Sequence, residues 1–364
     1  MSHPHPSPFL DAMKSQGGVT GDHHGQTLVR HFGDPHGEYI AATEAVAVFD
    51  RSHRTRLVVS GRSPRQMLGG ILTGTIPAPP AAGGEGVLGG TATYHAVLTP
   101  KGKMLTDLWC LCRAEADAGG DFLLDVPVAG RAALLDHLRK ALPPRLAKVE
   151  DVTHATASLS VVGPTAGRHV SSLALGLRVD DDELSALAEG EWRTAGAFAD
   201  GGVAVMRTGE VWPEAYTLYG PTASMGVLWK ALAHGGARPA GLGVWSTLRV
   251  EAGRPAFGTD MDESTIPIEA GIHERAIDYT KGCYTGQEVI VRIRDRGHVN
   301  RNLRQLMLGD VPAPHRGAEL FVEGSDRPVG HVTSAVESPR FAQTVALGYV
   351  RRGVEGVVRV GDGR

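Results

Sequence analysis

The most distinctive stretch of the chain, on which the expected fold rests, reads Lys281-Gly282-Cys283-Tyr284-Thr285-Gly286-Gln287-Glu288 (KGCYTGQE). Its cysteine lies between two glycines in a cation-rich region. From residue 281 to residue 304 the chain holds six lysines and arginines but only two acids. Neighbouring cations favour the thiolate form of a cysteine, and glycines allow a ligand to approach the backbone closely. A buried, inert cysteine would instead be expected among apolar residues, so Cys283 is predicted to be functional.

Arginines alternate directly after this stretch, at Arg292, Arg294 and Arg296. The alternation predicts a strand that carries all three side chains on one face. That face would bind a carboxylate tail or a phosphate, or it would be a solvated strand edge paired with acids such as Asp260 and Asp262. Both interpretations remain open. Direct RNA binding by this face is a third and the least favoured interpretation.

The bulk composition is that of a globular protein with more than one packed unit. At 364 residues, the chain is longer than a single hydrophobic core usually supports. The net charge of −3 excludes overall basicity as a route to nucleic acid. No apolar run is long enough to span a membrane. Three cysteines are too few for a disulfide framework or for a cluster held by four thiolates, and they favour a reducing cytoplasm.

The first 25 residues are predicted to form a disordered tail. They are rich in His, Pro, Gly and Ser, and they contain neither an apolar signal core nor an Arg-rich amphipathic pattern. The histidines of this tail, including His23 and His24, are expected to be solvated. Further along the chain, Cys110 and Cys112 share one face of a predicted strand and have apolar neighbours, which favours core packing.

The rest of the chain divides into two regions near residue 302. Within residues 26–301, strand and helix patterns alternate twice; the strand pattern at 55–61, for example, precedes Ser63 and Pro64, which are typical of a helix start. This alternation predicts two related α/β units, interleaved within one region. After residue 301, short strands separated by Pro and Gly predict a small β-barrel domain at 302–364. The expected fold class is therefore α+β.

Several motifs, taken in order along the chain, resemble the YgfZ family, whose members are related to the glycine-cleavage aminomethyltransferase (T-protein). The stretch KGCYTGQE is similar to the YgfZ signature residue for residue. Other segments resemble elements of the wider superfamily: F-D-x-S-H at 49–53, R-T-G at 207–209, L-R-x-E-A-G at 248–253 and D-M-D-E at 260–263. The segment ALGYV at 346–350 resembles the end of the superfamily's barrel.

The resemblance implies an aminomethyltransferase-like folate-binding fold, in which α/β units and a C-terminal β-barrel surround a central channel. It also implies a tetrahydrofolate-binding accessory protein for the assembly or repair of iron–sulfur proteins, including iron–sulfur-dependent tRNA-modifying enzymes. The expected partners are folate and iron–sulfur client proteins, and a transient iron–sulfur cluster is a further expected cofactor. Cys283 is the residue on which that family depends.

Other positions depart from the transferase branch and argue against aminomethyl transfer. The segment after R-T-G reads EVWPEAYT, so the folate-contacting glutamate of that branch is lost or displaced, with Glu214 as the nearest substitute. Trp245 replaces the arginine of an L-G-A-R-D motif, and the transferase branch has no K-G-C. Asp107, however, matches the catalytic aspartate of that branch. The alternative function is therefore a folate-dependent aminomethyltransferase or one-carbon transferase that uses Asp107 as its acid/base group.

The implied folate site combines an aromatic ring, carboxylates and arginines. Trp245 is expected to stack on the flat pterin ring. Glu251 or Asp107 would accept hydrogen bonds from that ring, and the Arg292/Arg294 face would bind the glutamyl carboxylates. Cys283, as a thiolate, would handle sulfur, iron or a labile cluster.

Overall fold

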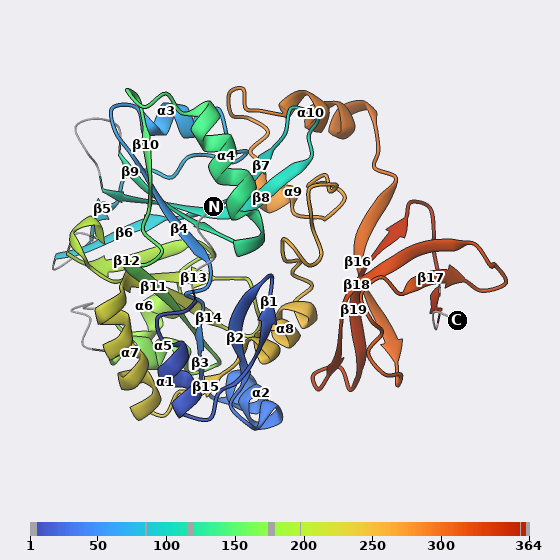
Figure 1. The fold of residues 1–364 in the computed structure, drawn as a ribbon, viewed down its shortest axis with the longest axis horizontal. Coiled ribbons are helices and arrows are strands. Elements are labelled where there is room, and N and C mark those ends of the chain that lie inside the picture. Colours follow the sequence, from blue (N-terminus) through green and yellow to red (C-terminus); the bar gives the residue numbers. More distant parts are fainter. Residues whose placement is uncertain are drawn as a thin grey trace.

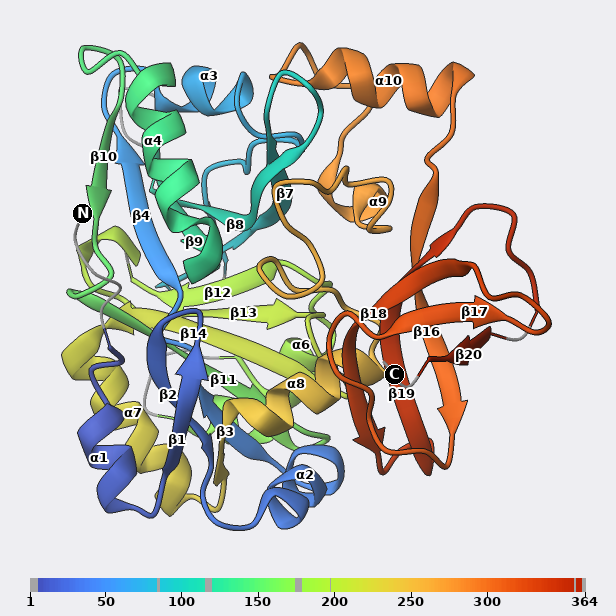
Figure 2. The same ribbon diagram turned by 45° about the vertical axis from the view of Figure 1, so that its right-hand side comes forward.

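The computed structural model describes residues 6–83, 86–114, 120–173, 179–196, 198–356 and 358–361. These residues form a body built on two large sheets and, beside it, a C-terminal sheet that is orange to red in Figure 1. Figure 2 shows the same body with its two sheets one above the other. None of the helices in the described ranges is long and apolar enough to cross a bilayer.

The first large sheet is antiparallel, with the strand order β10-β4-β9-β8-β7. Its strands are β4 (Thr55–Ser60), β7 (Thr93–Leu98), β8 (Met104–Ala114), β9 (Asp121–Val126) and β10 (Lys148–Asp151). Helices α3 (Pro64–Gly69) and α4 (Arg131–Ala141) cover one face, where they share an apolar core with alternate strand residues. Cys110 and Cys112 lie in this core, as predicted, because side chains two residues apart on a strand share a face.

The second large sheet has the strand order β15-β3-β11-β14-β13-β12-β6-β5 and is antiparallel except for the β15–β3 pair. Its strands are β3 (Ala47–Asp50), β5 (Ala81–Ala82), β6 (Val87–Thr91), β11 (Thr156–Val162), β12 (Glu191–Ala195), β13 (Ala204–Thr208), β14 (Ala215–Pro221) and β15 (Arg238–Ala240). The two sheets meet through a core that includes Trp109 of β8 and Trp192 of β12. The body is therefore one packed unit rather than two independent ones.

Helices cover both faces of the second sheet at its β3 end. They are α1 (Leu10–Ser15), α2 (Pro35–Glu44), α5 (Ala166–Ser171), α6 (Asp181–Ser185), α7 (Thr222–His234) and α8 (Leu242–Glu251). Val48 of β3 packs in the core beneath α7, and its neighbour Phe49 packs on the opposite face against α8. Because consecutive strand residues point to opposite faces, β3 reads as a continuous apolar run.

The N-terminal segment is ordered from residue 6, so the prediction of a disordered tail over residues 1–25 is wrong for the part that the structure describes. Helix α1 buries Leu10 and Met13, and β1 (Val19–His23) pairs with β2 (Gln26–His31). The turn of this hairpin has φ of 52° at His24 and 79° at Gly25. Two positive φ values are what a tight two-residue hairpin turn requires. The apolar pattern of this segment is too short to stand out in the sequence.

The C-terminal sheet forms a curled barrel-like domain after residue 301. Its strands are β16 (Arg301–Gly309), β17 (Glu319–Val322), β18 (Pro328–Ser338), β19 (Gln343–Arg351) and β20 (Val358–Val360), in the order β16-β19-β18-β17-β20. The inward-facing residues, such as Leu320 and Val332, form a separate apolar core. Arg249 of α8 reaches this domain and donates a hydrogen bond to the Ser334 hydroxyl at 2.8 Å.

The arginines at 292–296 lie on a helix, not on the predicted strand. Helix α10 spans Gln287–Arg296 and follows the short helix α9 (His273–Ala276). Its first residue follows Gly286, whose left-handed φ of 84° ends the preceding loop. Ile290 is buried, while the surrounding polar residues face solvent. The run of β-branched residues at 289–291 favours a strand only weakly, and the buried position of Ile290 outweighs it.

Candidate functional site

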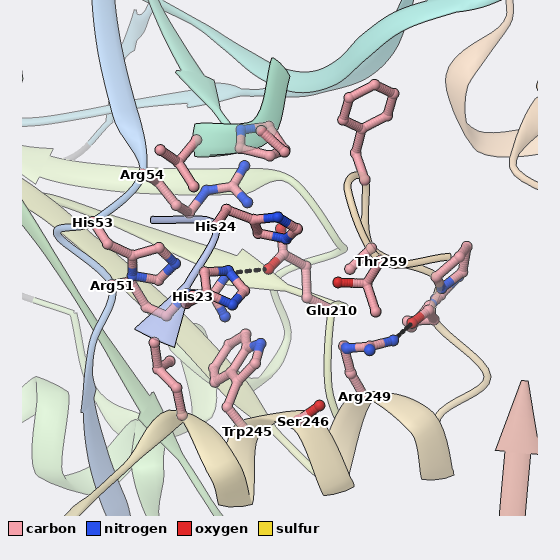
Figure 3. Close-up of a pocket in the computed structure, with 18 of the residues that line it drawn as sticks. His23, His24, Arg51, His53, Arg54, Glu210, Trp245, Ser246, Arg249 and Thr259 are labelled. Atoms are coloured by element: carbon pink, nitrogen blue, oxygen red, sulfur yellow. Dashed lines mark hydrogen bonds and ion pairs between the residues drawn. The ribbon is translucent and has the colours of Figure 1, made fainter. Parts of the chain in front are cut away.

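A cavity of about 250 Å³ lies where the two large sheets, α8 and the tip of the β1–β2 hairpin meet (Figure 3). The segment between β3 and β4 supplies Arg51, His53 and Arg54 to its wall. This segment is positioned there because β3 and β4 belong to different sheets, so the chain must cross between them. Further lining residues come from β7, β8, α8 and the loop after α8.

Asp107 of β8 is the cavity's buried acid. Its Oδ2 accepts a hydrogen bond from the Tyr94 hydroxyl at 2.5 Å, and its Oδ1 has no hydrogen-bond partner among the described residues. Burial raises the pKa of Asp107 from 3.8 to about 6, although the hydrogen bond from Tyr94 opposes the shift. A buried carboxylate with one free oxygen and a pKa near neutrality is suited to general acid–base chemistry.

A second acid, Glu210, is bound by two donors. Its Oε2 accepts from Nη2 of Arg51 at 3.1 Å, and its Oε1 accepts from the indole nitrogen of Trp109 at 3.0 Å. Burial opposes ionisation of Glu210, but Arg51 and Arg54 outweigh burial and hold the pKa of its carboxyl below the ordinary value. Glu210 is therefore a fixed negative charge in the cavity wall.

Arg54 is held on the other side of the cavity by a carboxylate in β9. Its Nε donates to both carboxylate oxygens of Asp125, at 2.9 and 3.0 Å, and its Nη2 donates to the carbonyl oxygen of the same residue at 3.2 Å. The Tyr219 hydroxyl donates to Asp125 Oδ2 at 2.8 Å. This buried network fixes the first sheet to the second, since Asp125 and Tyr219 come from different sheets.

Three histidines line the cavity. His23 is partly buried, contrary to the expectation that it is solvated, whereas His24 is exposed as expected. The ring of His23 packs against the rings of His24 and His53, with centroid distances of 4.5 and 5.5 Å. Figure 3 shows His23 and His24 reaching into the cavity from the hairpin tip. Burial lowers the pKa of His23 to about 4 and that of His53 well below its ordinary value, so both are neutral at physiological pH. No cluster of three metal-binding side chains occurs within the described ranges.

Two of the predicted site residues, Asp107 and Trp245, line this cavity. Trp245 lies on α8, and the guanidinium of Arg51 lies 3.7 Å from the centroid of its ring. The rings of Trp245 and Phe49 pack in an edge-to-face arrangement, with their centroids 5.4 Å apart. One face of Trp245 is thus covered by a cation, and a ligand at that side would meet Arg51 rather than the indole.

The other two predicted carboxylates lie outside the cavity. Glu251 is buried between α2 and the C-terminal domain, where it accepts hydrogen bonds from the hydroxyls of Tyr39 at 3.0 Å and Ser338 at 2.5 Å. Glu214 pairs with Arg207 at 2.8 Å and accepts from the Tyr216 hydroxyl at 2.6 Å. Both carboxylates already have protein partners, so their contacts are structural.

The stretch KGCYTGQE also lies outside the cavity, where it fastens the start of α10 to the segment that follows α3, residues 70–74. Lys281 donates through Nζ to the carbonyl oxygens of Leu72 and Gly74, at 2.5 and 2.9 Å. The amide of Thr285 donates to the Gly70 carbonyl at 3.0 Å. Tyr284 is buried, whereas Gly282, Cys283 and Glu288 are exposed and Gln287 opens α10.

Cys283 and the arginines of α10 are therefore not brought together with Asp107. Cys283 is an exposed free thiol and does not line the cavity. Arg294 pairs with Asp295 at 2.5 Å and lies over the ring of Tyr279 at 4.8 Å. Arg292 and Arg294 are two residues apart on a helix, so they point to nearly opposite sides of it and do not form the expected carboxylate-binding surface.

Sequence reasoning missed most of the cavity wall, including Arg51, Glu210 and His23. Arg51 stands within the quoted F-D-x-S-H motif at its variable position, and Glu210 directly follows R-T-G. Glu210, rather than the predicted substitute Glu214, is the glutamate that lies in the cavity wall after this motif. His23 was missed because the hairpin that carries it was not predicted.

Comparisons with known proteins give one consistent family. Residues 9–281 match the GCVT N-terminal domain, and residues 301–361 match the glycine cleavage T-protein C-terminal barrel domain. An aminomethyltransferase of Rubrobacter xylanophilus is 30% identical over 351 residues, covering 96% of this chain and 88% of the relative. An aminomethyltransferase of Bacillus subtilis is 26% identical over 348 residues, covering 94% of this chain and 90% of the relative.

A solved structure has the same fold. The crystal structure of glycine cleavage system aminomethyltransferase T from Bartonella henselae aligns with a TM-score of 0.82, covering 100% of this chain and 95% of that one at 20% identity. The predicted fold class, an aminomethyltransferase-like α+β fold with a C-terminal barrel, is thereby confirmed.

The expectation of an accessory protein for iron–sulfur enzymes is wrong. The relatives that match along nearly the whole chain are named aminomethyltransferase, which agrees with the alternative function instead. Those names give no support to iron–sulfur clients, a transient cluster or a link to tRNA modification. The expectation rested on Cys283 as the functional residue. Asp107 lies in the cavity and Cys283 does not, so Asp107 is the better guide to function.

Proposed function

This chain belongs to the glycine cleavage T-protein (GCVT) family, and we propose that it is a folate-dependent aminomethyltransferase. The substrates are a donor with an aminomethyl group and tetrahydrofolate, and the reaction takes place in the central cavity. The observation that carries this proposal is Asp107, a buried carboxylate whose Oδ1 finds no hydrogen-bond partner in the part of the chain that the structure describes, and whose pKa is raised to about 6. Such a group holds or releases a proton near neutral pH.

The proposed transfer balances when the aminomethyl carbon is carried on sulfur. Its bonds to sulfur and to the amino nitrogen break, and two new bonds form to N5 and N10 of tetrahydrofolate. The two protons lost from those nitrogens go to the departing thiolate and to the departing ammonia. Asp107 is placed to take one of these protons, because its ionised form predominates above a pH of about 6. No oxidant or reductant is needed.

The chain's own groups would orient the folate. The buried end of the cavity offers the acceptors Asp107 and Glu210 for ring N–H groups, together with the donor Arg51. Arg30 of β2 lines the cavity and is exposed, so its charge suits a flexible carboxylate tail that extends toward solvent. This arrangement replaces the expected tail site on Arg292 and Arg294.

The YgfZ-like stretch fits this proposal as a structural variation of the family. KGCYTGQE still resembles the YgfZ signature, so we place the chain in a YgfZ-like branch that keeps the transferase aspartate. In the structure this stretch connects α10 to the segment after α3, residues 70–74, through Lys281 and Thr285. A cytoplasmic location remains a prediction from the low cysteine count.

A turnover assay with matched variants tests the proposed function. The full-length protein is mixed with tetrahydrofolate and a small thioether that carries an aminomethyl group, and folate-dependent release of ammonia is followed. Asp107→Asn keeps the size of the side chain but removes its base, so turnover is expected to fall by roughly 100-fold or more. Cys283→Ala is the control and is expected to keep the wild-type rate. Equal rates for wild type and Asp107→Asn would reject the assignment.

A further inference from the structure

Arg51 is a buried cation in the cavity wall. It follows β3, its side chain is only 7% exposed, and its guanidinium carbon lies over the ring of Trp245, 3.7 Å from the ring centroid. Figure 3 shows it between His53, His23 and Trp245, with its bond to Glu210 drawn as a dashed line. The residue is therefore held in place on one face by an aromatic ring and at one end by a carboxylate.

The hydrogen-bonding capacity of Arg51 is largely unused. A guanidinium has five N–H donors, and the described residues supply an acceptor only to Nη2, through Glu210. Nε and Nη1, which carry three of the five N–H groups, are buried without a partner. Arg54 offers a contrast in the same wall, because Asp125 accepts from both its Nε and its Nη2. Buried N–H groups of a charged side chain are costly to leave unpaired, so a ligand acceptor there would be bound strongly.

We infer that Arg51 binds the exocyclic oxygen on C4 of the folate pterin and so selects 4-oxo ligands over 4-amino ligands. This inference rests on the proposed function, which supplies the ligand class. The pterin is favoured over the carboxylate tail because Arg51 is buried, whereas the exposed Arg30 is available at the solvent side. The rest of the ring complements the wall, since its N–H groups would face the acceptors Asp107 and Glu210.

The cavity would distinguish the two ligands by the hydrogen-bonding character of the group on C4, because a 4-oxo and a 4-amino group have nearly the same size and shape. A 4-oxo group accepts a hydrogen bond from Arg51, whereas a 4-amino group would direct its own N–H groups at the guanidinium. A site built around buried donors rejects an analogue of the same size that lacks the matching acceptor. The cavity is therefore expected to discriminate between two ligands that differ at a single substituent.

The experiment measures dissociation constants of tetrahydrofolate and of its 4-amino analogue, tetrahydroaminopterin, by calorimetric titration of the full-length protein. Wild type is expected to bind the 4-oxo ligand roughly 10- to 100-fold more tightly, the range for one hydrogen bond to a charged group. Arg51→Met is expected to reduce that ratio to about threefold or less. Arg254→Met removes the same charge elsewhere in the cavity wall and is expected to keep the wild-type ratio.

The ratio is informative even if a variant is partly unfolded, because both constants are measured on the same protein and the folded fraction cancels. If Arg51→Met yields no folded protein, Arg51→Lys takes its place, since it keeps the charge beside Glu210 but loses the planar fork of donors. A wild-type ratio near one, or a ratio unchanged by both substitutions, overturns the inference while leaving the proposed function intact. Failure of wild type to bind either ligand overturns both.

Discussion

At the scale of the residue, the ionisation of Asp107 controls the proposed chemistry. Burial raises its pKa to about 6, and the hydrogen bond from Tyr94 acts in the opposite direction. Because a base must be ionised, kcat/KM is expected to rise with pH and to level off above a midpoint near 6. Tyr94→Phe removes the opposing hydrogen bond, so its midpoint is expected at higher pH. A pH–rate profile with a midpoint near 4 in both proteins would contradict this assignment.

The same residue also makes stability depend on pH. The pKa of Asp107 is about 6 in the folded protein, compared with the ordinary value of 3.8 that applies to the unfolded chain. The folded protein therefore binds the proton more tightly. Stability therefore falls as pH rises from about 4 to 6, by roughly 3 kcal/mol at most, and stays lower above 6. Asp107→Asn removes this cost and is expected to be more stable than wild type at pH 8 but not at pH 4. Chemical denaturation at both pH values measures the difference, and a less stable variant at pH 8 would contradict it.

The role of a residue could be predicted where a sequence motif identifies it. It could not be predicted where the role depends on how distant elements pack together. Asp107 was identified within a short acidic motif, and Trp245 by its departure from an expected arginine. Glu251 was misassigned because it lies in a conspicuous motif, yet Tyr39 and Ser338 already bond to its carboxylate. Which carboxylate faces a cavity depends on packing between elements far apart in the chain, and no local pattern records that.

At the scale of the element, the start of α10 explains why KGCYTGQE has its composition. Gly286 has a φ of 84°, and a β-carbon there would lie 2.6 Å from the Thr99 carbonyl oxygen. Gly286→Ala is therefore expected to lower the free energy of unfolding by about 2 kcal/mol. Gly282→Ala is the control, because a β-carbon at Gly282 would have no neighbour within 4 Å. Urea denaturation compares the two, and equal effects would show that the turn does not require glycine.

The elements themselves were predicted unevenly, for physical reasons. The strands and helices of the body follow strong apolar periodicity, such as the buried positions Leu134 and Leu138 of α4. The β1–β2 hairpin has no comparable pattern, since only Gln26, Leu28 and Val29 are buried in its strands. Its stability comes from packing on α8 and α1, which are contacts that the hairpin sequence does not reveal.

At the scale of the whole molecule, a buried ion pair of the body, Arg249–Asp260, is hydrogen-bonded to the C-terminal domain. Asp260 has a fully buried side chain, accepts from Arg249 at 2.7 Å and accepts from the hydroxyls of Thr333 and Ser334, both at 2.6 Å. Removing the acid leaves the buried charge of Arg249 without its opposite charge, with only the uncharged acceptors Ser334 and Arg254 O beside it. Asp260→Ala is therefore expected to cost about 3–5 kcal/mol of stability.

A surface pair provides the matched control for that prediction. Asp136 and Lys140 lie 2.6 Å apart on α4, but both side chains are exposed. Water screens such a pair, so Asp136→Ala is expected to leave the unfolding transition unchanged. Thermal denaturation of both variants distinguishes the two cases. A loss for Asp136→Ala as large as that for Asp260→Ala would mean that burial does not set the strength of these pairs.

The overall architecture was predicted from KGCYTGQE together with motifs spread along the rest of the chain. The α+β class and a C-terminal barrel beginning near residue 302 agree with a sheet that starts at Arg301. The function was mispredicted because the prediction relied on the rare stretch KGCYTGQE, whereas the acid that lines the cavity is Asp107. Whether Cys283 or Asp107 lies in the cavity depends on how two sheets and α8 close around it, which is a property of the assembled fold.

The most direct test of the central claim follows the transferred carbon itself. The full-length protein is incubated with tetrahydrofolate and a thioether carrying a ¹³C-aminomethyl group, and the product is examined by ¹³C NMR. The account predicts that wild type and Cys283→Ala both place the label between N5 and N10 of the folate, and that Asp107→Asn does so far more slowly. A label that stays on the donor with wild type, or reaches the folate equally fast with Asp107→Asn, would contradict the account.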